Sequence, residues 1–111
     1  MKIKNNPIDI LLTVFEENYS ETAKQIKEIF FAKVDKGYAC TVFSDDGIYI
    51  YISPFIKYKK PITFEIATEL LAHELAHAIC GENAEHNEKW EQAFERLNEL
   101  FYEYLDDEYK K

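Results

Sequence analysis

The stretch that decides the fold is His73-Glu74-Leu75-Ala76-His77, which lies in an apolar segment and is followed by His86. The chain has 3 histidines, and all of them lie between positions 73 and 86. Residues four apart lie on the same face of a helix, so His73 and His77 can bind one metal ion together. His86 can supply a third ligand from outside that helix. The pattern therefore predicts a helix over this segment with a metal site on one face.

Three imidazoles beside a glutamate are typical of a catalytic zinc site. Such a site has three protein ligands and leaves one position for water, whereas a structural site is closed by four ligands. Glu74 follows the first ligand and can accept a proton from the water that zinc activates. We predict one Zn²⁺ ion held by His73, His77 and His86, with Glu74 as the general base of peptide-bond hydrolysis.

The third ligand has alternatives. His86 can instead cap the following helix and have no part in the metal site. A carboxylate of the last helix is then the competing ligand, and the candidates are Glu91, Glu95 and Glu99. Charged residues on such a helix usually form a solvated face. A turn beginning at Gly81 favours His86, because it can return the chain toward the first two histidines.

Composition and charge limit the class of protein. A chain of 111 residues with 47% hydrophobic residues is predicted to form a single domain over residues 1–111 with a packed core. The net charge of −8 argues against nucleic acid as a partner, because binding to phosphate backbones relies on clustered Lys and Arg. The N-terminal segment resembles no signal peptide, and no apolar run is long enough for a membrane span, so we expect a cytoplasmic protein. We expect Cys40 and Cys80 to be reduced and mostly buried, with a disulfide as the alternative.

The N-terminal third reads as helical. Asn6 and Pro7 are typical of a helix start, and the apolar residues that follow share one face, namely Ile8, Leu11, Leu12 and Phe15. After a break, Ser20 can cap a second helical stretch that ends at Gly37, and the sequence fits either one kinked helix or two separate helices. Its apolar residues recur at helical spacing: Ala23, Ile26, Ile29, Phe30 and Val34.

The middle of the chain predicts a β-hairpin. Two runs rich in β-branched and aromatic residues, Tyr38 to Phe43 and Ile48 to Ile52, flank Asp46-Gly47. The second run alternates strictly, with isoleucines on one face and tyrosines on the other. Residues 55–60 read as a basic, aromatic connection.

Two further helices are predicted in the C-terminal half. Thr63 can cap the helix that carries His73 and His77, and Gly81 can end it. The last helix shows apolar residues at spacings of three and four: Trp90, Phe94, Leu97, Phe101 and Tyr104. Residues 106–111 read as a frayed, acidic tail.

At these motifs the chain resembles a known family. His-Glu-Leu-Ala-His-Ala-Ile from His73, a short loop and then His86-Asn87-Glu88-Lys89-Trp90 resemble the SprT-like zinc metallopeptidases. The order of elements also resembles the minimal soluble gluzincins, the selecase-like peptidases. The resemblance implies that three histidines bind zinc, that Glu74 is the catalytic base and that Trp90 belongs to the core. Asn87-Glu88 stands where the SprT-like family commonly has Gly-Pro, and its basic DNA-binding extensions have no counterpart, so no DNA-repair role is expected.

The surroundings of the site give three weaker expectations. The Ile48 to Ile52 strand resembles the zincin edge strand that holds a peptide substrate by backbone pairing, and a tyrosine that the sequence does not single out can assist the oxyanion. Exposed aromatic residues can drive self-association, with Phe55, Tyr58, Tyr49 and Tyr51 as the candidates. The acidic tail, Asp106 to Glu108, can fold over the cleft and inhibit the site by placing a carboxylate on the metal.

Together these observations predict a minimal zincin-like α+β domain with N-terminal backing helices, a small sheet containing a hairpin, an HExxH active-site helix and a C-terminal helix. The predicted function is zinc-dependent endopeptidase activity on peptide or protein substrates. The alternative is a regulatory or structural zinc-binding module on the same scaffold without turnover. Glu74 favours the enzyme, because a purely structural site has no need of it.

Overall fold

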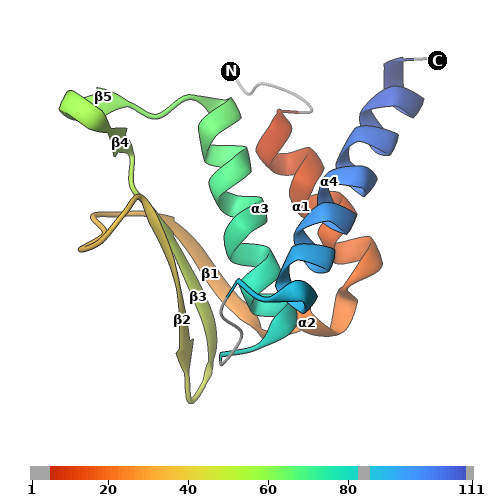
Figure 1. Cartoon of the computed structure of the whole chain (residues 1–111), viewed down its shortest axis with the longest axis horizontal. Helices are drawn as coiled ribbons and strands as arrows, with labels where there is room; N and C mark the ends of the chain where they lie inside the picture. Colours follow the sequence, from red (N-terminus) through yellow and green to blue (C-terminus); the bar gives the residue numbers. More distant parts are fainter. Residues whose placement is uncertain (1–5, 83–85, 110–111) are drawn as a thin grey trace.

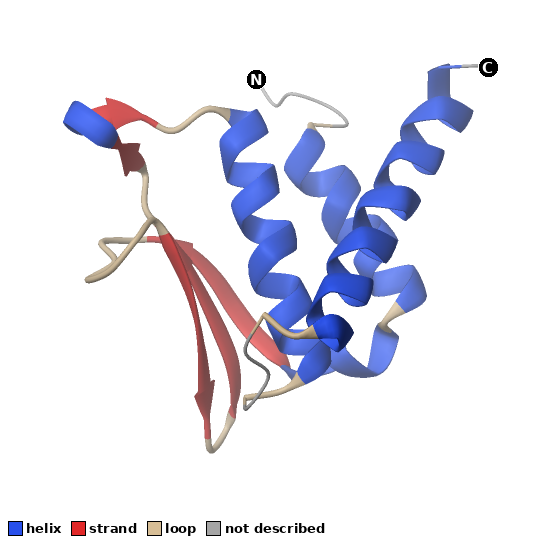
Figure 2. Ribbon diagram, viewed as in Figure 1, coloured by secondary structure: helices blue, strands red, loops and turns tan. Residues whose placement is uncertain are grey.

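The predicted α+β class is confirmed by a computed structural model, which describes residues 6–82 and 86–109. In these residues, helices α1, α3 and α4 pack together on one face of a three-stranded sheet of order β1-β3-β2 (Figures 1 and 2). Helix α3 (Phe64–Cys80) lies between the sheet and the other helices, since it contacts α1, α4, β2 and β3. A separate two-stranded sheet, β4-β5, lies beyond the end of the main sheet.

Helix α1 (Pro7–Asn18) begins as the sequence predicts. The side chain of Asn6 accepts a hydrogen bond from the backbone N–H of Asp9 at 2.9 Å, and Pro7 occupies the first turn. Leu11 and Phe15 are buried as expected, and the buried face also includes Ile10 and Val14. Helix α1 therefore backs α3 and α4 through a cluster of buried apolar side chains.

The predicted second helix to Gly37 is wrong beyond its first turns. Helix α2 (Ser20–Gln25) is short and starts after Tyr19, and the chain then forms strand β1 (Ile26–Phe31). The spacing of Ile26, Ile29 and Phe30 fits a helix, but short apolar runs fit a buried strand equally well. Parallel pairing with β3 places Ile29 beside Ile50, provides hydrogen-bond partners along one side of the β1 backbone and covers the core. Tertiary pairing thus outweighs the local periodicity.

The predicted hairpin is confirmed. Strands β2 (Ala39–Ser44) and β3 (Gly47–Ile52) pair antiparallel, with Ser44 opposite Gly47 at the turn. All three isoleucines of β3 are buried against the helices: Ile48, Ile50 and Ile52. Tyr49 and Tyr51 are half-buried on the opposite face, where the Phe30 ring stacks on Tyr51 with centroids 5.1 Å apart.

The strand predicted to pair with a substrate, Ile48 to Ile52, is not an edge strand. Strand β3 lies between β1 and β2, so its backbone is paired on both sides. Strand β2 is the edge strand beside α3. Strands β1 and β2 are the two edges of the sheet, and β2 (Ala39–Ser44), the other half of the predicted hairpin, is the edge that lies beside α3 and is free to pair with another chain there.

The basic connection folds into a small protrusion. Strands β4 (Phe55–Ile56) and β5 (Lys60–Pro61) flank the 3₁₀ turn Lys57–Lys59. Phe55 is 51% exposed and Tyr58 is 91% exposed, whereas Tyr49 and Tyr51 are half-buried. Self-association through exposed aromatic residues stays a prediction for which Phe55 and Tyr58 are the best placed.

The two C-terminal helices are confirmed, with a longer last helix than predicted. The Thr63 side chain accepts from the N–H of Ile66, and Gly81, with φ 98°, ends α3 by donating its N–H to the carbonyl of His77. Helix α4 (Glu88–Tyr109) buries Trp90, Leu97 and Phe101. The frayed tail is wrong for residues 106–109, because α4 continues through them, and residues 110–111 lie outside the described chain.

A substitution at Gly47 tests the unexpected placement of strand β1 beside the hairpin turn. Its φ is +146°, and a Cβ there would lie 2.6 Å from Lys27 Cγ and 2.7 Å from the carbonyl oxygen of Gln25. Gly37, with φ +70°, has open space around it. We expect Gly47→Ala to destabilise the protein by about 2–4 kcal/mol and Gly37→Ala by about 1 kcal/mol. Urea unfolding of both variants measures this difference, and equal losses would show that the α2–β1 junction does not lie beside the hairpin turn.

Candidate metal centre

Helix α3 presents His73 and His77 on one face, as the spacing predicts. The rings of these residues are 5.0 Å apart between centroids, and both side chains are partly buried. The intervening apolar residues Leu75 and Ala76 are fully buried, so the other faces of the helix pack against the core. The hydrophobic packing of α3 therefore fixes the direction of the two imidazoles.

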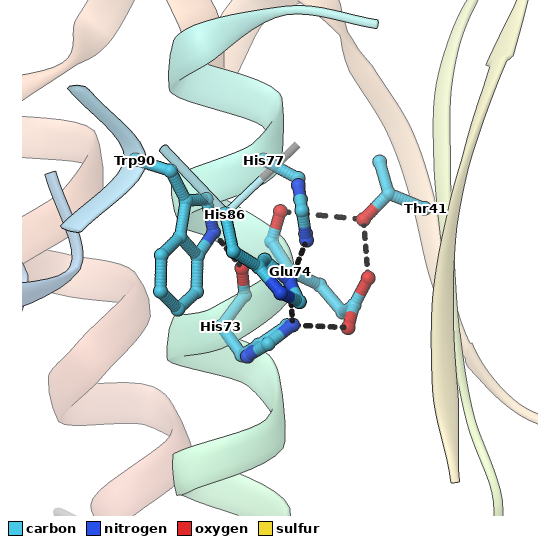
Figure 3. Close-up of polar contacts among 6 residues, drawn as sticks. All are labelled: Thr41, His73, Glu74, His77, His86 and Trp90. Atoms are coloured by element: carbon cyan, nitrogen blue, oxygen red, sulfur yellow. Dashed lines mark hydrogen bonds and ion pairs between the residues drawn. The ribbon is translucent and has the colours of Figure 1, made fainter. Parts of the chain in front are cut away.

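His86 joins them from just before α4 (Figure 3). Its Nε2 atom lies 3.0 Å from Nε2 of His73 and 3.0 Å from Nε2 of His77. The prediction that a turn from Gly81 returns the chain falls partly on residues 83–85, outside the described chain. Among the described residues on either side of this gap, three ligand atoms from two segments lie within 4.8 Å of one another.

Hydrogen bonding alone does not satisfy this arrangement. An imidazole Nε2 carries either one proton or one lone pair, so the Nε2 atom of His86 can form a hydrogen bond with only one of its two neighbours. A shared cation satisfies all three nitrogens at once. Two nitrogens of a tetrahedral zinc ion, each about 2.0–2.1 Å from the metal, lie about 3.3 Å apart, close to the separations seen here. The three histidines thus fit a metal ion.

Trp90 supports the three rings from behind. The centroid of its indole lies 4.7 Å from that of the His73 ring and 4.5 Å from that of the His86 ring. Only 8% of the Trp90 surface is exposed. Its Nε1–H donates to the backbone carbonyl of His73 at 3.3 Å. The Phe94 ring stacks on the indole with centroids 5.1 Å apart. The predicted core position of Trp90 is confirmed, and that position holds α4 against the metal-binding face of α3.

The electrostatics favour the neutral form of His73. Burial, followed by the positive charges that His77 and His86 can carry, lowers the pKa of His73 from 6.5 to about 4. A neutral imidazole is the form that binds a metal ion. His73 is therefore ready to bind a cation at neutral pH without first losing a proton.

Glu74 points away from the core toward the sheet. Only 5% of the residue is exposed, and its Oε2 atom lies 3.9 Å from His73 Nε2. Its Oε1 atom accepts a hydrogen bond from the hydroxyl of Thr41 at 2.8 Å. Burial raises the pKa of Glu74, while the Thr41 hydrogen bond and the charge of His86 oppose that rise. The carboxylate therefore has a greater proton affinity than an exposed glutamate, as a general base requires.

An open cleft of about 720 Å³ lies between the histidines and β2. Its walls are β2 on one side and the metal-binding face of α3 on the other. The lining residues are Ala39, Cys40, Thr41, Val42, Phe43, His73, Glu74, His77, Glu82 and His86. The cleft can thus place an extended ligand across both Glu74 and the three imidazoles.

The alternative ligands on α4 do not join this cluster. Glu91, Glu95 and Glu99 line a different groove on the outer surface of α4, and Glu99 pairs with Arg96 at 3.0 Å. Among the described His, Cys, Asp and Glu residues, the group that can hold a metal ion is His73, His77 and His86. His86, rather than a carboxylate, is therefore the third member.

The cysteines are free thiols, as predicted, and not a disulfide. Both are half-buried rather than buried, and burial raises the pKa of each. No helix within residues 6–82 and 86–109 is long and apolar enough to cross a membrane.

The inhibitory tail is contradicted by the course of α4. At 1.5 Å per residue, Asp106 lies about 24 Å along the helix axis from Trp90. Figure 1 shows the C-terminal end of α4 pointing away from the hairpin side of the molecule. The carboxylate groups of residues 106 and 107 therefore lie far from the three histidines.

The double variant Asp106→Asn/Asp107→Asn should leave zinc affinity and peptide cleavage within about twofold of the wild-type values, because neither carboxylate approaches the site. Zinc titration and cleavage rates of the two proteins measure this. A severalfold rise in the cleavage rate, or a severalfold fall in zinc affinity, would restore the inhibitory tail.

The sequence did not indicate Thr41. A lone threonine in a strand has no distinctive pattern, and its contact with Glu74 joins residues 33 positions apart. The role of β2 as the edge strand was missed for a related reason, since it follows from β1 pairing with β3, and β1 had been predicted as helix.

Comparison with models of known families, with curated proteins and with solved structures found no match. The resemblance to zincins accordingly depends on the residues between His73 and Trp90.

Proposed function

We propose that this protein is a zinc-dependent endopeptidase of the HExxH type. The observation that carries the proposal is the meeting of three histidine Nε2 atoms beside a buried glutamate, on the floor of an open cleft. The donor set supports zinc, because imidazole nitrogens suit Zn²⁺ and three of them leave a coordination position for the reaction. Cobalt and nickel suit the same ligands, so the choice of metal belongs to the proposal.

In this proposal, His73, His77 and His86 would hold a zinc ion, which would polarise the scissile carbonyl and lower the pKa of a water molecule to about 7. Glu74 accepts the proton of the attacking water and then donates it to the leaving amine. The Oε2 atom on the histidine side, 3.9 Å from His73 Nε2, is the one placed for this transfer. Trp90 keeps the ligand rings oriented through its contacts with His73 and His86.

The cleft wall supports an extended peptide as the substrate. The N–H of Ser53 donates to the carbonyl of Tyr38, so these two residues form a hydrogen-bonded pair of the β2–β3 ladder. Such pairs alternate with residues whose backbone groups point outward. Ala39, Thr41 and Phe43 therefore turn their N–H and C=O groups toward the free edge, where a substrate strand can pair with them. This kind of binding needs no particular side chains and favours unfolded polypeptides.

The alternative is a metal-binding module without turnover. The open cleft beside the histidines and the burial of Glu74, which is 5% exposed, favour the enzyme. Burying a carboxylate destabilises a fold, and a purely structural zinc site does not need one.

The experiment that tests the proposal is cleavage of an unfolded protein in water enriched in ¹⁸O, with the metal-free protein supplied with one equivalent of zinc. Hydrolysis predicts new internal termini whose carboxyl groups carry ¹⁸O, detected by mass spectrometry. The same sample with a chelator in place of zinc is the control. Intact substrate in the presence of bound zinc would support the non-catalytic module.

A further inference from the structure

Thr41 makes a contact with Glu74 that the proposed function leaves unexplained. Its hydroxyl donates to Glu74 Oε1 at 2.8 Å and lies 3.3 Å from the backbone carbonyl oxygen of the same residue. Figure 3 shows the Thr41 side chain reaching from β2 across to the carboxylate on α3. The contact therefore joins the edge strand to the helix at the reacting end of the cleft.

The hydrogen bond distinguishes the two carboxylate oxygens. Oε1 is engaged by Thr41, while Oε2 faces His73 at 3.9 Å. A carboxylate on a glutamate side chain can otherwise rotate about its last torsion, which is broad and roughly two-fold. Fixing Oε1 to the strand holds Oε2 on the side of the three imidazoles.

Thr41 also lies where substrate backbone would bind. Its side chain contacts Glu74, and its own N–H and C=O groups point to the free edge of β2, as the pairing of Tyr38 with Ser53 establishes. One residue thus joins the peptide-binding edge to the proton-accepting carboxylate. A substrate strand that pairs with Thr41 would immobilise the residue that orients Glu74.

We propose that Thr41 is a positioning residue, which holds Glu74 so that Oε2 faces the metal centre and which couples substrate pairing on β2 to that orientation. This inference rests on the proposed peptidase function for its catalytic meaning, while the contact itself can be tested without activity.

The catalytic test compares Thr41→Val, which keeps the shape and removes the hydroxyl, with Thr41→Ser, which keeps the hydroxyl. In the zinc-loaded protein, Thr41→Val should lower kcat at least about tenfold with KM changed less than about threefold, because a misplaced base slows the chemical step. Thr41→Ser should restore kcat to within about threefold of wild type. A structural role would not separate the two variants in this way.

Thr68→Val is the matched control. Thr68 is also a threonine with a hydrogen-bonded hydroxyl, and it is buried on α3. Its hydroxyl donates to the backbone carbonyl of Phe64 at 2.6 Å and lies outside the cleft. Its replacement should leave kcat within about twofold of wild type. Wild-type kcat in Thr41→Val, or equal losses in Thr41→Val and Thr41→Ser, would overturn the proposal.

A second measurement uses unfolding of the metal-free protein by urea and needs no activity. Thr41→Val should lower the midpoint in the wild-type background, and the shift should fall to less than about half in the Glu74→Ala background, because the partner is then gone. Equal shifts in both backgrounds would show that Thr41 does not hold Glu74. An inactive wild type together with unequal shifts would instead reject the peptidase function and leave the Thr41–Glu74 contact standing as structural.

Discussion

Glu74→Gln is expected to lower kcat for peptide hydrolysis by about 10²–10⁴-fold, the range that general acid–base catalysis contributes. The amide cannot accept the proton from water, whereas its shape is nearly that of the carboxylate. The three imidazoles remain in place, so the variant should still bind one zinc ion per chain. Cleavage rates and metal content measured on the same preparation test this result.

The same substitution should not cost stability. Burial is the main cause of the raised pKa of Glu74, which means that the fold disfavours the ionised carboxylate relative to the neutral form. A neutral glutamine removes that penalty and can still accept the hydrogen bond from Thr41. We therefore expect the urea midpoint of Glu74→Gln at neutral pH to equal or exceed that of the wild type.

Glu69→Gln is the matched control for this prediction, because Glu69 is an exposed acid on the same helix and lines a groove away from the histidines. It should keep the wild-type kcat. A Glu74→Gln protein that still cleaves at more than about a tenth of the wild-type rate would remove Glu74 from the role of general base.

The second large effect concerns the three ligands. Zinc at a thousand times its Kd should stabilise the wild-type protein by about 4 kcal/mol. In a domain of this size, that gain corresponds to a rise in Tm of roughly 15–30 °C. Replacing any one of His73, His77 and His86 by alanine should remove most of this rise, because two imidazoles bind zinc far more weakly than three. Thermal unfolding of each protein with and without zinc measures the loss.

His86→Ala is the most informative of the three variants. Its side chain is exposed, so the metal-free variant should unfold at nearly the wild-type temperature, and a lost zinc response then reports on metal binding alone. Glu95→Gln, on the outer groove of α4, is the control and should keep the full response. A full zinc response in His86→Ala, or its loss in Glu95→Gln, would return the third ligand to the acids of α4.

The site was more predictable from the sequence than the fold around it. The spacing of His73 and His77 requires only a helix, and Thr63 and Gly81 mark the ends of that helix by local hydrogen bonds. His86 followed from a short return of the chain. These inferences depend on neighbours in the sequence, and local geometry decides them.

The elements that failed depend on distant partners. Strand β1 was predicted as helix because the spacing of Ile26, Ile29 and Phe30 suits both structures, and only its pairing with β3 decides between them. That pairing also leaves β2 as the edge strand beside α3, where Thr41 meets Glu74. The end of α4 was predicted as frayed from its charge, but helical backbone continues through it to Tyr109. The acidic character of this segment therefore did not predict its backbone structure.

The most direct test of the central claim, a three-histidine zinc centre that hydrolyses peptide bonds, is a titration of the metal-free protein with zinc while cleavage of an unfolded protein is followed. The account predicts that the cleavage rate rises in proportion to added zinc and reaches its plateau at one equivalent per chain. Zinc that binds with the same stoichiometry without any cleavage would contradict it.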